Sequence, residues 1–182
     1  MTLLNSKMVP LGTKVIDFDL PGTDDKNYSL GSFKDKKVLV IIFMCNHCPY
    51  VIAVLDRIIA IQNDYADKGI QLIGINPNDT VNYPEDSFEN MKKIVKERNI
   101  PFPYLIDESQ DIAKKYDAVC TPDIYVYGKE RTLLYRGRID DNWQEESKVT
   151  KRDLRDALDA ILKGNPVSEE QVPSMGCSIK WK

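Results

Sequence analysis

The feature that most constrains this chain is an uninterrupted apolar run, VLVIIFM at residues 38–44, in which four of the side chains are β-branched. A strand that is apolar at every position is covered on both faces, as in sheets that carry helices on each side. Cys45 follows directly, and beyond it apolar residues recur at helical spacing up to a stop at Gly69. We therefore expect a central strand, a tight turn and a helix, the start of an α/β fold.

The rest of the chain continues this alternation. Residues 70–76 (IQLIGIN) predict a second buried strand, and the D-x-x-E pattern of Asp86 and Glu89 predicts the capped start of the next helix. Thr150 is expected to cap the final helix, which Gly164 ends. Between these helices we expect, in chain order, a strand at 101–107, a short helix at 109–116 and two antiparallel strands at 123–128 and 132–139.

These elements predict an α/β chain with a central mixed β-sheet flanked by helices on both faces. Residues 15–20 and 28–30 flank a turn and predict an N-terminal β-hairpin extension. The length of 182 residues suits one domain, which we place at residues 1–164. Residues 165–182 form a C-terminal tail, which we expect to pack on or near the domain.

Composition excludes several classes of function. The 25 Lys and Arg residues are scattered among 28 Asp and Glu residues, so nothing attracts nucleic acid or an anionic membrane. The N-terminus lacks the pattern of a secretory signal, and the longest apolar run is too short to span a bilayer. We expect a cytoplasmic protein. Thiols are kept reduced there, so four cysteines, two of them in a C-x-x-C motif, suggest redox catalysis or metal binding.

Cys45 and Cys48 lie where the central strand ends and the long helix begins. The first amides of a helix lack internal partners and carry partial positive charge, which stabilises a thiolate. The pKa of a thiol, near 8.5 when unperturbed, falls to roughly 3.5–7.5 in such settings. We predict that Cys45 is the partly exposed thiol of lowered pKa. Cys48, three residues later, is expected to lie deeper and to resolve a mixed disulfide.

Three residues of the motif support this pair. Pro49 is suited to the first helical turn, where its missing N–H would have had no partner. His47, the only histidine, favours a thiolate at Cys45 as a donor or cation. Asn46 completes the turn between the cysteines.

The C-N-H-C turn, followed by Thr121 and Pro122 before a later strand, resembles the thioredoxin superfamily. The segments FMCNHCPYV, VCTPD, YRGRIDDNW and GCSIKWK resemble its peroxiredoxin-like (redoxin, AhpC/TSA-type) branch. The resemblance implies a thioredoxin-like fold and a cis peptide between Thr121 and Pro122. It also implies that this proline faces the two cysteines and receives an extended substrate chain beside Cys45.

The chain departs from both patterns. Thioredoxins keep a buried carboxylate six residues before the first cysteine, and here that position is Leu39, so the usual proton acceptor is missing. The peroxiredoxin motif P-x-x-x-T/S-x-x-C, laid on Cys48, places Ile41 at the proline and Cys45 at the hydroxyl position. Laid on Cys45, the motif meets Val38 and Ile42 instead. The residues that shape a peroxide pocket are therefore absent from the motif.

Three functions are open. In the leading one the chain is a thiol–disulfide oxidoreductase: Cys45 attacks a protein or small-molecule disulfide, Cys48 resolves it, and an external thiol reductant resets the pair. The second is a thiol peroxidase that reduces a hydroperoxide through a sulfenic acid. The third is a non-catalytic module that holds an extended peptide beside the proline.

The other two cysteines leave alternatives open. Cys120 adjoins Thr121, so simple packing and modulation of the site are both consistent with it. Cys177 can reach the pair, because 13 residues of extended tail span up to ~43 Å, but burial beside Ile179 and Trp181 is favoured. Both are kept as additional redox candidates. They are too isolated to complete a zinc site with one imidazole, and we expect no metal and no cofactor.

Two further expectations concern charge. The charged residues near the end of the last strand suggest either a proton relay or, by preference, ordinary salt bridges; they are Arg136, Arg138, Asp140 and Asp141. His47 and the missing acid at Leu39 predict a reduction potential above the value near −270 mV of thioredoxin, because no buried negative charge opposes the thiolate.

Overall fold

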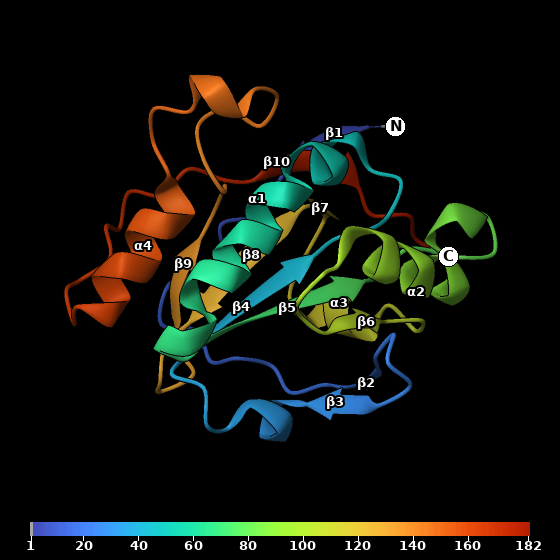
Figure 1. The fold of residues 1–182 in the computed structure, drawn as a ribbon, viewed down its shortest axis with the longest axis horizontal. Coiled ribbons are helices and arrows are strands. Elements are labelled where there is room, and N and C mark those ends of the chain that lie inside the picture. The colour runs from blue at the N-terminus through green and yellow to red at the C-terminus, as the bar shows by residue number, and fades with distance from the viewer. Residues whose placement is uncertain (1) are drawn as a thin grey trace.

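The computed structural model describes residues 2–182 and has a five-stranded mixed sheet at its centre, shown in Figure 1. In spatial order its strands are β6 (Tyr104–Ile106), β5 (Ile70–Asn76), β4 (Val38–Phe43), β8 (Asp123–Tyr127) and β9 (Leu133–Arg136). The first three run parallel, and β8 and β9 are antiparallel to their neighbours. Every residue of β4 is buried, which confirms it as the central strand.

Helices cover both faces of this sheet, as predicted. Alternate residues of a strand point to opposite faces, and β4 contributes Val40 and Ile42 to one core cluster and Leu39 and Ile41 to the other. The first cluster includes buried side chains of the longer helices α1 (Pro49–Tyr65), α2 (Phe88–Arg98) and α4 (Asp153–Leu162). The second lies under α3 (Asp111–Lys115) and the predicted hairpin, formed by β2 (Asp19–Pro21) and β3 (Asn27–Ser29).

Short 3-10 helices complete the chain: η1 (Leu30–Phe33), η2 (Ala66–Lys68), η3 (Pro84–Asp86) and η4 (Glu146–Lys148). No helix within residues 2–182 is long and apolar enough to cross a bilayer.

Two predicted helix caps are wrong. The cap of α2 is Ser87, whose hydroxyl accepts a hydrogen bond from the amide of Asn90, 3.4 Å away. Asp86 is fully buried and its carboxylate is bonded elsewhere. Helix α4 starts three residues after Thr150, because the hydroxyl and amide of Thr150 bind the carboxylate of Asp141 instead. In both cases a tertiary contact takes the side chain that the local pattern assigned to the helix.

A second, three-stranded sheet joins the two ends of the chain. Its order is β1 (Leu3–Asn5), β10 (Met175–Ser178) and β7 (Cys120–Thr121), with antiparallel pairing throughout. Figure 1 shows β1 and β10 side by side near the start of α1. The sequence pattern predicted no strand in the tail, because β10 has no alternation of apolar and polar residues.

Gly176 allows β10 to approach β7 closely. A Cβ atom at this position would lie 2.0 Å from the carbonyl oxygen of Thr121 and 3.1 Å from the nitrogen of Pro122, both backbone atoms that cannot swing aside. We expect Gly176→Ala to lower the free energy of unfolding in urea by about 1–3 kcal/mol or more, as overpacking does. Gly31→Ala is the matched control, since its nearest neighbour is the Ser29 hydroxyl at 3.4 Å. Equal losses in the two variants would contradict this account of the close approach.

Candidate active site

The two cysteines lie in the turn that connects β4 to α1. Cys48 is the N-cap residue of α1 and Pro49 is its first helical residue, as predicted. Cys45 follows one residue after the strand and is 2% exposed, while Cys48 is 0% exposed. Each thiol is within hydrogen-bonding range of the other. The predicted partial exposure of Cys45 is therefore wrong.

The connection between β7 (Cys120–Thr121) and β8 (Asp123–Tyr127) lies against this turn. The peptide bond between Thr121 and Pro122 is cis, which confirms the prediction. The Thr121 hydroxyl oxygen is 3.4 Å from the Cys45 sulfur, and the Thr121 carbonyl oxygen is 3.1 Å from the Cys48 sulfur. Pairing of β8 with β4, which sets Asp123 opposite Phe43, brings the loop to the cysteines.

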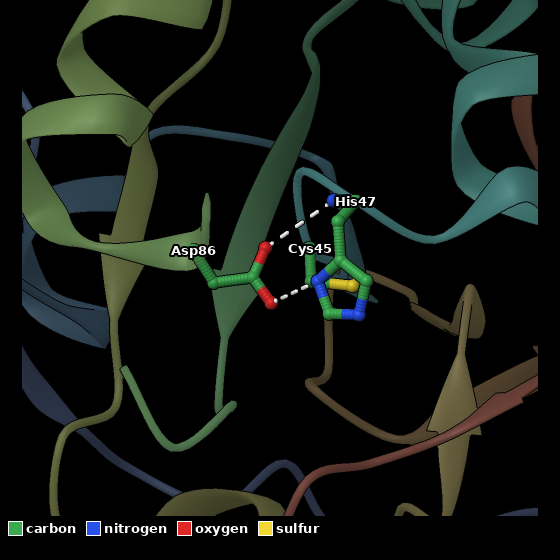
Figure 2. Close-up of side chains that lie close together, drawn as sticks. All are labelled: Cys45, His47 and Asp86. Atoms are coloured by element: carbon green, nitrogen blue, oxygen red, sulfur yellow. Dashed lines mark hydrogen bonds and ion pairs between the residues drawn. The ribbon is translucent and has the colours of Figure 1, made fainter. Parts of the chain in front are cut away.

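A buried carboxylate forms hydrogen bonds with the other side of the turn. The sequence did not predict this contact. Asp86, at the end of η3, accepts hydrogen bonds from the amide of Asn46 at 2.7 Å, from Nδ2 of Asn78 at 2.7 Å and from the amide of His47 at 3.3 Å. Its Oδ2 atom is also 2.7 Å from Nδ1 of His47. Figure 2 shows this carboxylate facing the His47 ring, with the sulfur of Cys45 close behind.

Position 39, where thioredoxins keep a buried carboxylate, is a leucine on β4 in this chain. Leu39 packs in the core cluster on the other face of the sheet and pairs with Tyr127. The buried acid near the turn is instead Asp86 of η3, 40 residues along the chain from Asn46. The one available signal was the D-x-x-E pattern at Asp86, which the cap prediction explained in another way.

The two residues between the cysteines are held in place. The side-chain amide of Asn46 donates to the carbonyl of Glu85 at 2.9 Å and its oxygen accepts from the Tyr104 hydroxyl at 3.0 Å. The His47 ring stacks on Tyr83 with centroids 5.6 Å apart. The 83–86 segment therefore holds the turn, while Asn46 and His47 keep partial exposure, with 19% of the His47 side chain accessible.

The negative charge of the reduced pair belongs on Cys48. A hydrogen bond from the Cys45 thiol is the largest influence, and with further bonds from the Thr121 hydroxyl, the Cys177 thiol and the Val51 amide it lowers the pKa of Cys48 to about 4 despite burial. The Thr121 carbonyl oxygen accepts a hydrogen bond only from the protonated form of Cys48, but the donors to Cys48 have the larger effect. The same bond to Cys48, together with burial and the charge of Asp86, raises the pKa of Cys45.

This distribution overturns two expectations. The thiol of lowered pKa is Cys48 and not Cys45, because Cys48 accepts a hydrogen bond from Cys45, while this bond, burial and the charge of Asp86 disfavour a thiolate at Cys45. The premise that no buried negative charge opposes a thiolate is also wrong, since Asp86 does so. The effect of His47 on the reduction potential remains a prediction.

A pH titration of the reduced protein tests the thiolate. We expect absorbance near 240 nm from the Cys48 thiolate to persist from pH 8 down to about pH 5, and Cys45→Ala to raise the pKa of Cys48 because it removes the main donor. Since the folded-state pKa is depressed, the thiolate stabilises the fold increasingly above pH 4 and this contribution is lost as the pH falls through that value.

Cys120→Ala is the control for this titration, because burial raises the pKa of Cys120 and leaves its thiol neutral. A wild-type protein without thiolate absorbance at pH 6 would overturn the assignment of charge to Cys48.

One cluster in this site offers metal ligands. The sulfur of Cys45, a ring nitrogen of His47 and a carboxylate oxygen of Asp86 lie within 4.8 Å of one another, a donor set that zinc accepts. Both oxygens of Asp86 already accept hydrogen bonds from the protein. The cluster is therefore satisfied as a network of hydrogen bonds.

The structure brings one of the two additional cysteines to the pair. Cys177, in β10, lies opposite Thr121 and its thiol is hydrogen-bonded to Cys48. The thiol of Cys120 lies 3.9 Å from the carbonyl oxygen of Pro122. Ile179 is buried near Cys177, as the packing alternative expected, but Trp181 is 42% exposed.

The four charged residues near the end of β9 have separate partners. Arg136 contacts Gln171, Arg138 pairs with Asp153, Asp140 forms a buried pair with Arg57, and Asp141 binds Thr150. The ion pairs of Arg138 and Asp140 support the salt-bridge alternative for these two residues.

A cavity of about 370 Å³ lies beside the cis-proline. Its lining includes Pro122, Tyr50 and Trp143, whose ring centroid is 4.2 Å from that of Tyr50, and Met175 of β10. Arg138 and Asp140 add charge to the wall. The cavity is large enough for a small organic group next to the dithiol turn.

Comparison with known proteins identifies a family and a fold. Residues 11–136 match the model of the AhpC/TSA family. Among curated proteins, none matches the chain.

Three solved structures are similar over nearly their full length. An uncharacterized conserved protein from Geobacillus kaustophilus is 46% identical, with a TM-score of 0.95, and covers 100% of this chain and 97% of its own. A hypothetical protein from Sinorhizobium meliloti is 42% identical, with a TM-score of 0.94 and 98% of each chain covered. A chain from Chlorobium tepidum, named as thiol:disulfide interchange protein DsbE, is 19% identical with a TM-score of 0.67, covering 84% of this chain and 98% of its own. That last similarity shows a shared thioredoxin-like fold only.

Proposed function

We propose that this chain, which belongs to the AhpC/TSA family, is a thiol–disulfide oxidoreductase that cycles Cys45 and Cys48 between dithiol and disulfide. The main support for this proposal is the hydrogen bond between the thiols of Cys45 and Cys48 at the N-terminus of α1, beside Thr121. Thiol–disulfide exchange by a protein pair needs a thiolate that lies next to a second thiol.

The chemistry follows from the charge distribution. The Cys48 thiolate attacks one sulfur of a substrate disulfide, forming a mixed disulfide and releasing the other substrate sulfur as a thiolate. Cys45 then attacks the Cys48 sulfur, the protein disulfide forms, and the second substrate sulfur leaves. The substrate gains two electrons from the two cysteines, one proton from Cys45 and one from water, and an external thiol reductant then reduces the protein disulfide. The order of attack is the reverse of the sequence-based hypothesis.

The burial of the two sulfurs restricts which substrates can reach them. Both sulfurs are at most 2% exposed, so the site must open locally before a disulfide can reach Cys48. We propose a small-molecule or protein disulfide as substrate, a cytoplasmic location where thiols are kept reduced, and no nucleic-acid or membrane partner. The charge balance of −3 without a basic stripe supports the last point.

A thiol peroxidase is the second candidate, and one contact favours it. The peroxiredoxin motif lacks its hydroxyl in this sequence, but Thr121 supplies one from another loop, 3.4 Å from the Cys45 sulfur. A hydroperoxide is also smaller than a disulfide. The binding-module alternative has less support, because β10 already occupies the edge of β7 beside the proline.

Turnover assays with dithiothreitol as reductant separate the three functions. The oxidoreductase proposal expects reduction of insulin or of a small aromatic disulfide well above the uncatalysed rate, and little consumption of hydroperoxide. Hydroperoxide-dependent thiol consumption alone would favour the peroxidase. No turnover of either substrate, with peptide binding unaffected by Cys45→Ser, would favour the module.

A further inference from the structure

Strand β10 brings a third sulfur to the dithiol turn. Cys177 lies directly opposite Thr121 in the antiparallel pair of β10 and β7. Opposite residues in such a pair have Cα atoms about 4.5–5.5 Å apart. The Thr121 carbonyl oxygen is itself 3.1 Å from the Cys48 sulfur. Backbone pairing alone therefore sets Cys177 and Cys48 against the same peptide group.

The close approach of the two strands reinforces this placement. Gly176 leaves no space for a Cβ atom, which would lie 2.0 Å from the Thr121 carbonyl oxygen. Strand β10 also pairs with β1 on its other edge, so it is held from both sides. The position of Cys177 is a consequence of this sheet and not of a mobile tail.

The three sulfurs form one contiguous group. Cys48 is hydrogen-bonded to Cys45 and to Cys177, and all three side chains are buried in the same core cluster. Cys120 has the same chemistry and is equally buried, but its thiol lies toward the carbonyl of Pro122. Cys48 is thus a shared partner with two possible resolving thiols.

We propose that Cys177 is a third redox cysteine, which forms a disulfide with Cys48 in place of Cys45. The inference rests on the proposed exchange chemistry and adds a second thiol that can resolve the mixed disulfide. In the direct route Cys48 attacks a substrate disulfide, and Cys177 then attacks the mixed disulfide at the Cys48 sulfur and releases the substrate thiolate. Two electrons pass from Cys48 and Cys177 to the substrate disulfide, and the Cys177 proton goes to the departing thiolate.

The same pair can form without further oxidant. The Cys177 sulfur attacks Cys48 in the Cys45–Cys48 disulfide, the new bond replaces the old, and Cys45 leaves as a thiolate that takes up the proton of Cys177. This exchange ties β10 to the start of α1. It also returns Cys45 to the thiol form beside His47 and Asp86.

The packing alternative explains less of the arrangement. A buried cysteine used as a small apolar residue needs only a filled space. Here the Cys177 thiol instead donates a hydrogen bond to Cys48, the thiol with the lowest pKa in the described chain. Gly176, on the same strand as Cys177, permits the close approach of β10 to β7.

Peptide mapping distinguishes the two accounts. Trypsin places Cys45 and Cys48 together in residues 38–57, Cys120 in residues 116–129 and Cys177 in residues 164–180. Reduced wild type, Cys45→Ser, Cys48→Ser and Cys120→Ser are oxidised with diamide, acid-quenched, alkylated and digested without reductant. Mass spectrometry then quantifies each linked pair of peptides.

We expect a link between residues 38–57 and 164–180 in wild type and, as the main oxidised form, in Cys45→Ser. The link should be at least about tenfold less abundant in Cys48→Ser, which lacks the shared partner, and unchanged in Cys120→Ser. Absence of the link from both wild type and Cys45→Ser, or a link from Cys45→Ser to residues 116–129 instead, would overturn the proposal. Because wild type is measured as well, a folding defect in one variant leaves the test intact.

The outcome is separable from that of the proposed function. If wild type reduces disulfides but never links Cys48 to Cys177, the oxidoreductase stands and the third cysteine fails. If the link forms but no substrate is turned over, the third cysteine stands and the oxidoreductase fails.

Discussion

Cys48→Ser is expected to reduce disulfide turnover by roughly a thousandfold or more, as loss of a nucleophile does. The variant removes the thiolate of lowered pKa and the sulfur that both neighbouring thiols contact. A serine hydroxyl is not ionised at neutral pH and forms no disulfide. Initial rates with a small aromatic disulfide and dithiothreitol measure the effect.

Two comparisons sharpen this prediction. Cys45→Ser is expected to lose less activity than Cys48→Ser, because Cys177 remains as a partner for Cys48. Cys120→Ser, a buried thiol outside the group, is the control and should keep the wild-type rate. If Cys45→Ser is the more damaging of the two substitutions, the original assignment of Cys45 as nucleophile is restored.

Asp86→Asn is expected to lower the free energy of unfolding by about 1–3 kcal/mol, the usual cost when a buried donor is left without its acceptor. Asp86 is fully buried and accepts from the amides of Asn46 and His47 and from the side chain of Asn78. An amide of the same size presents two donors of its own to these groups, so at least one is left without an acceptor. Urea denaturation of the reduced protein measures the loss.

The substitution should also alter the chemistry. Removing the charge of Asp86 eliminates one cause of the raised pKa of Cys45, so the second thiol should titrate at lower pH. Asp56→Asn is the control for stability, since the Asp56 side chain is 80% exposed and its pair with Arg98 is worth about 0–1 kcal/mol. Similar losses in the two variants would show that the Asp86 network does not support the turn.

Local pattern determined much of the architecture. The apolar run of β4, the position of Pro49 at the start of α1 and the helical spacing after it involve neighbours in sequence, so their physics can be read without coordinates. The junction of β4 and α1, where both cysteines lie, follows from the same pattern. The cis peptide before Pro122 was predicted from resemblance to a family and not from local pattern.

Tertiary structure decided which groups surround the sulfurs and where the charge resides. Asp86 reaches the turn across 40 residues of sequence from Asn46, and Cys177 reaches Cys48 through a strand with no periodic signal. The predicted thiolate at Cys45 was wrong because the Cys45 thiol donates to Cys48 within the same turn, and because Cys177 and Asp86, from distant segments, act in the same direction. A pKa depends on every charge and donor within a few ångströms, and only the folded chain determines which residues those are.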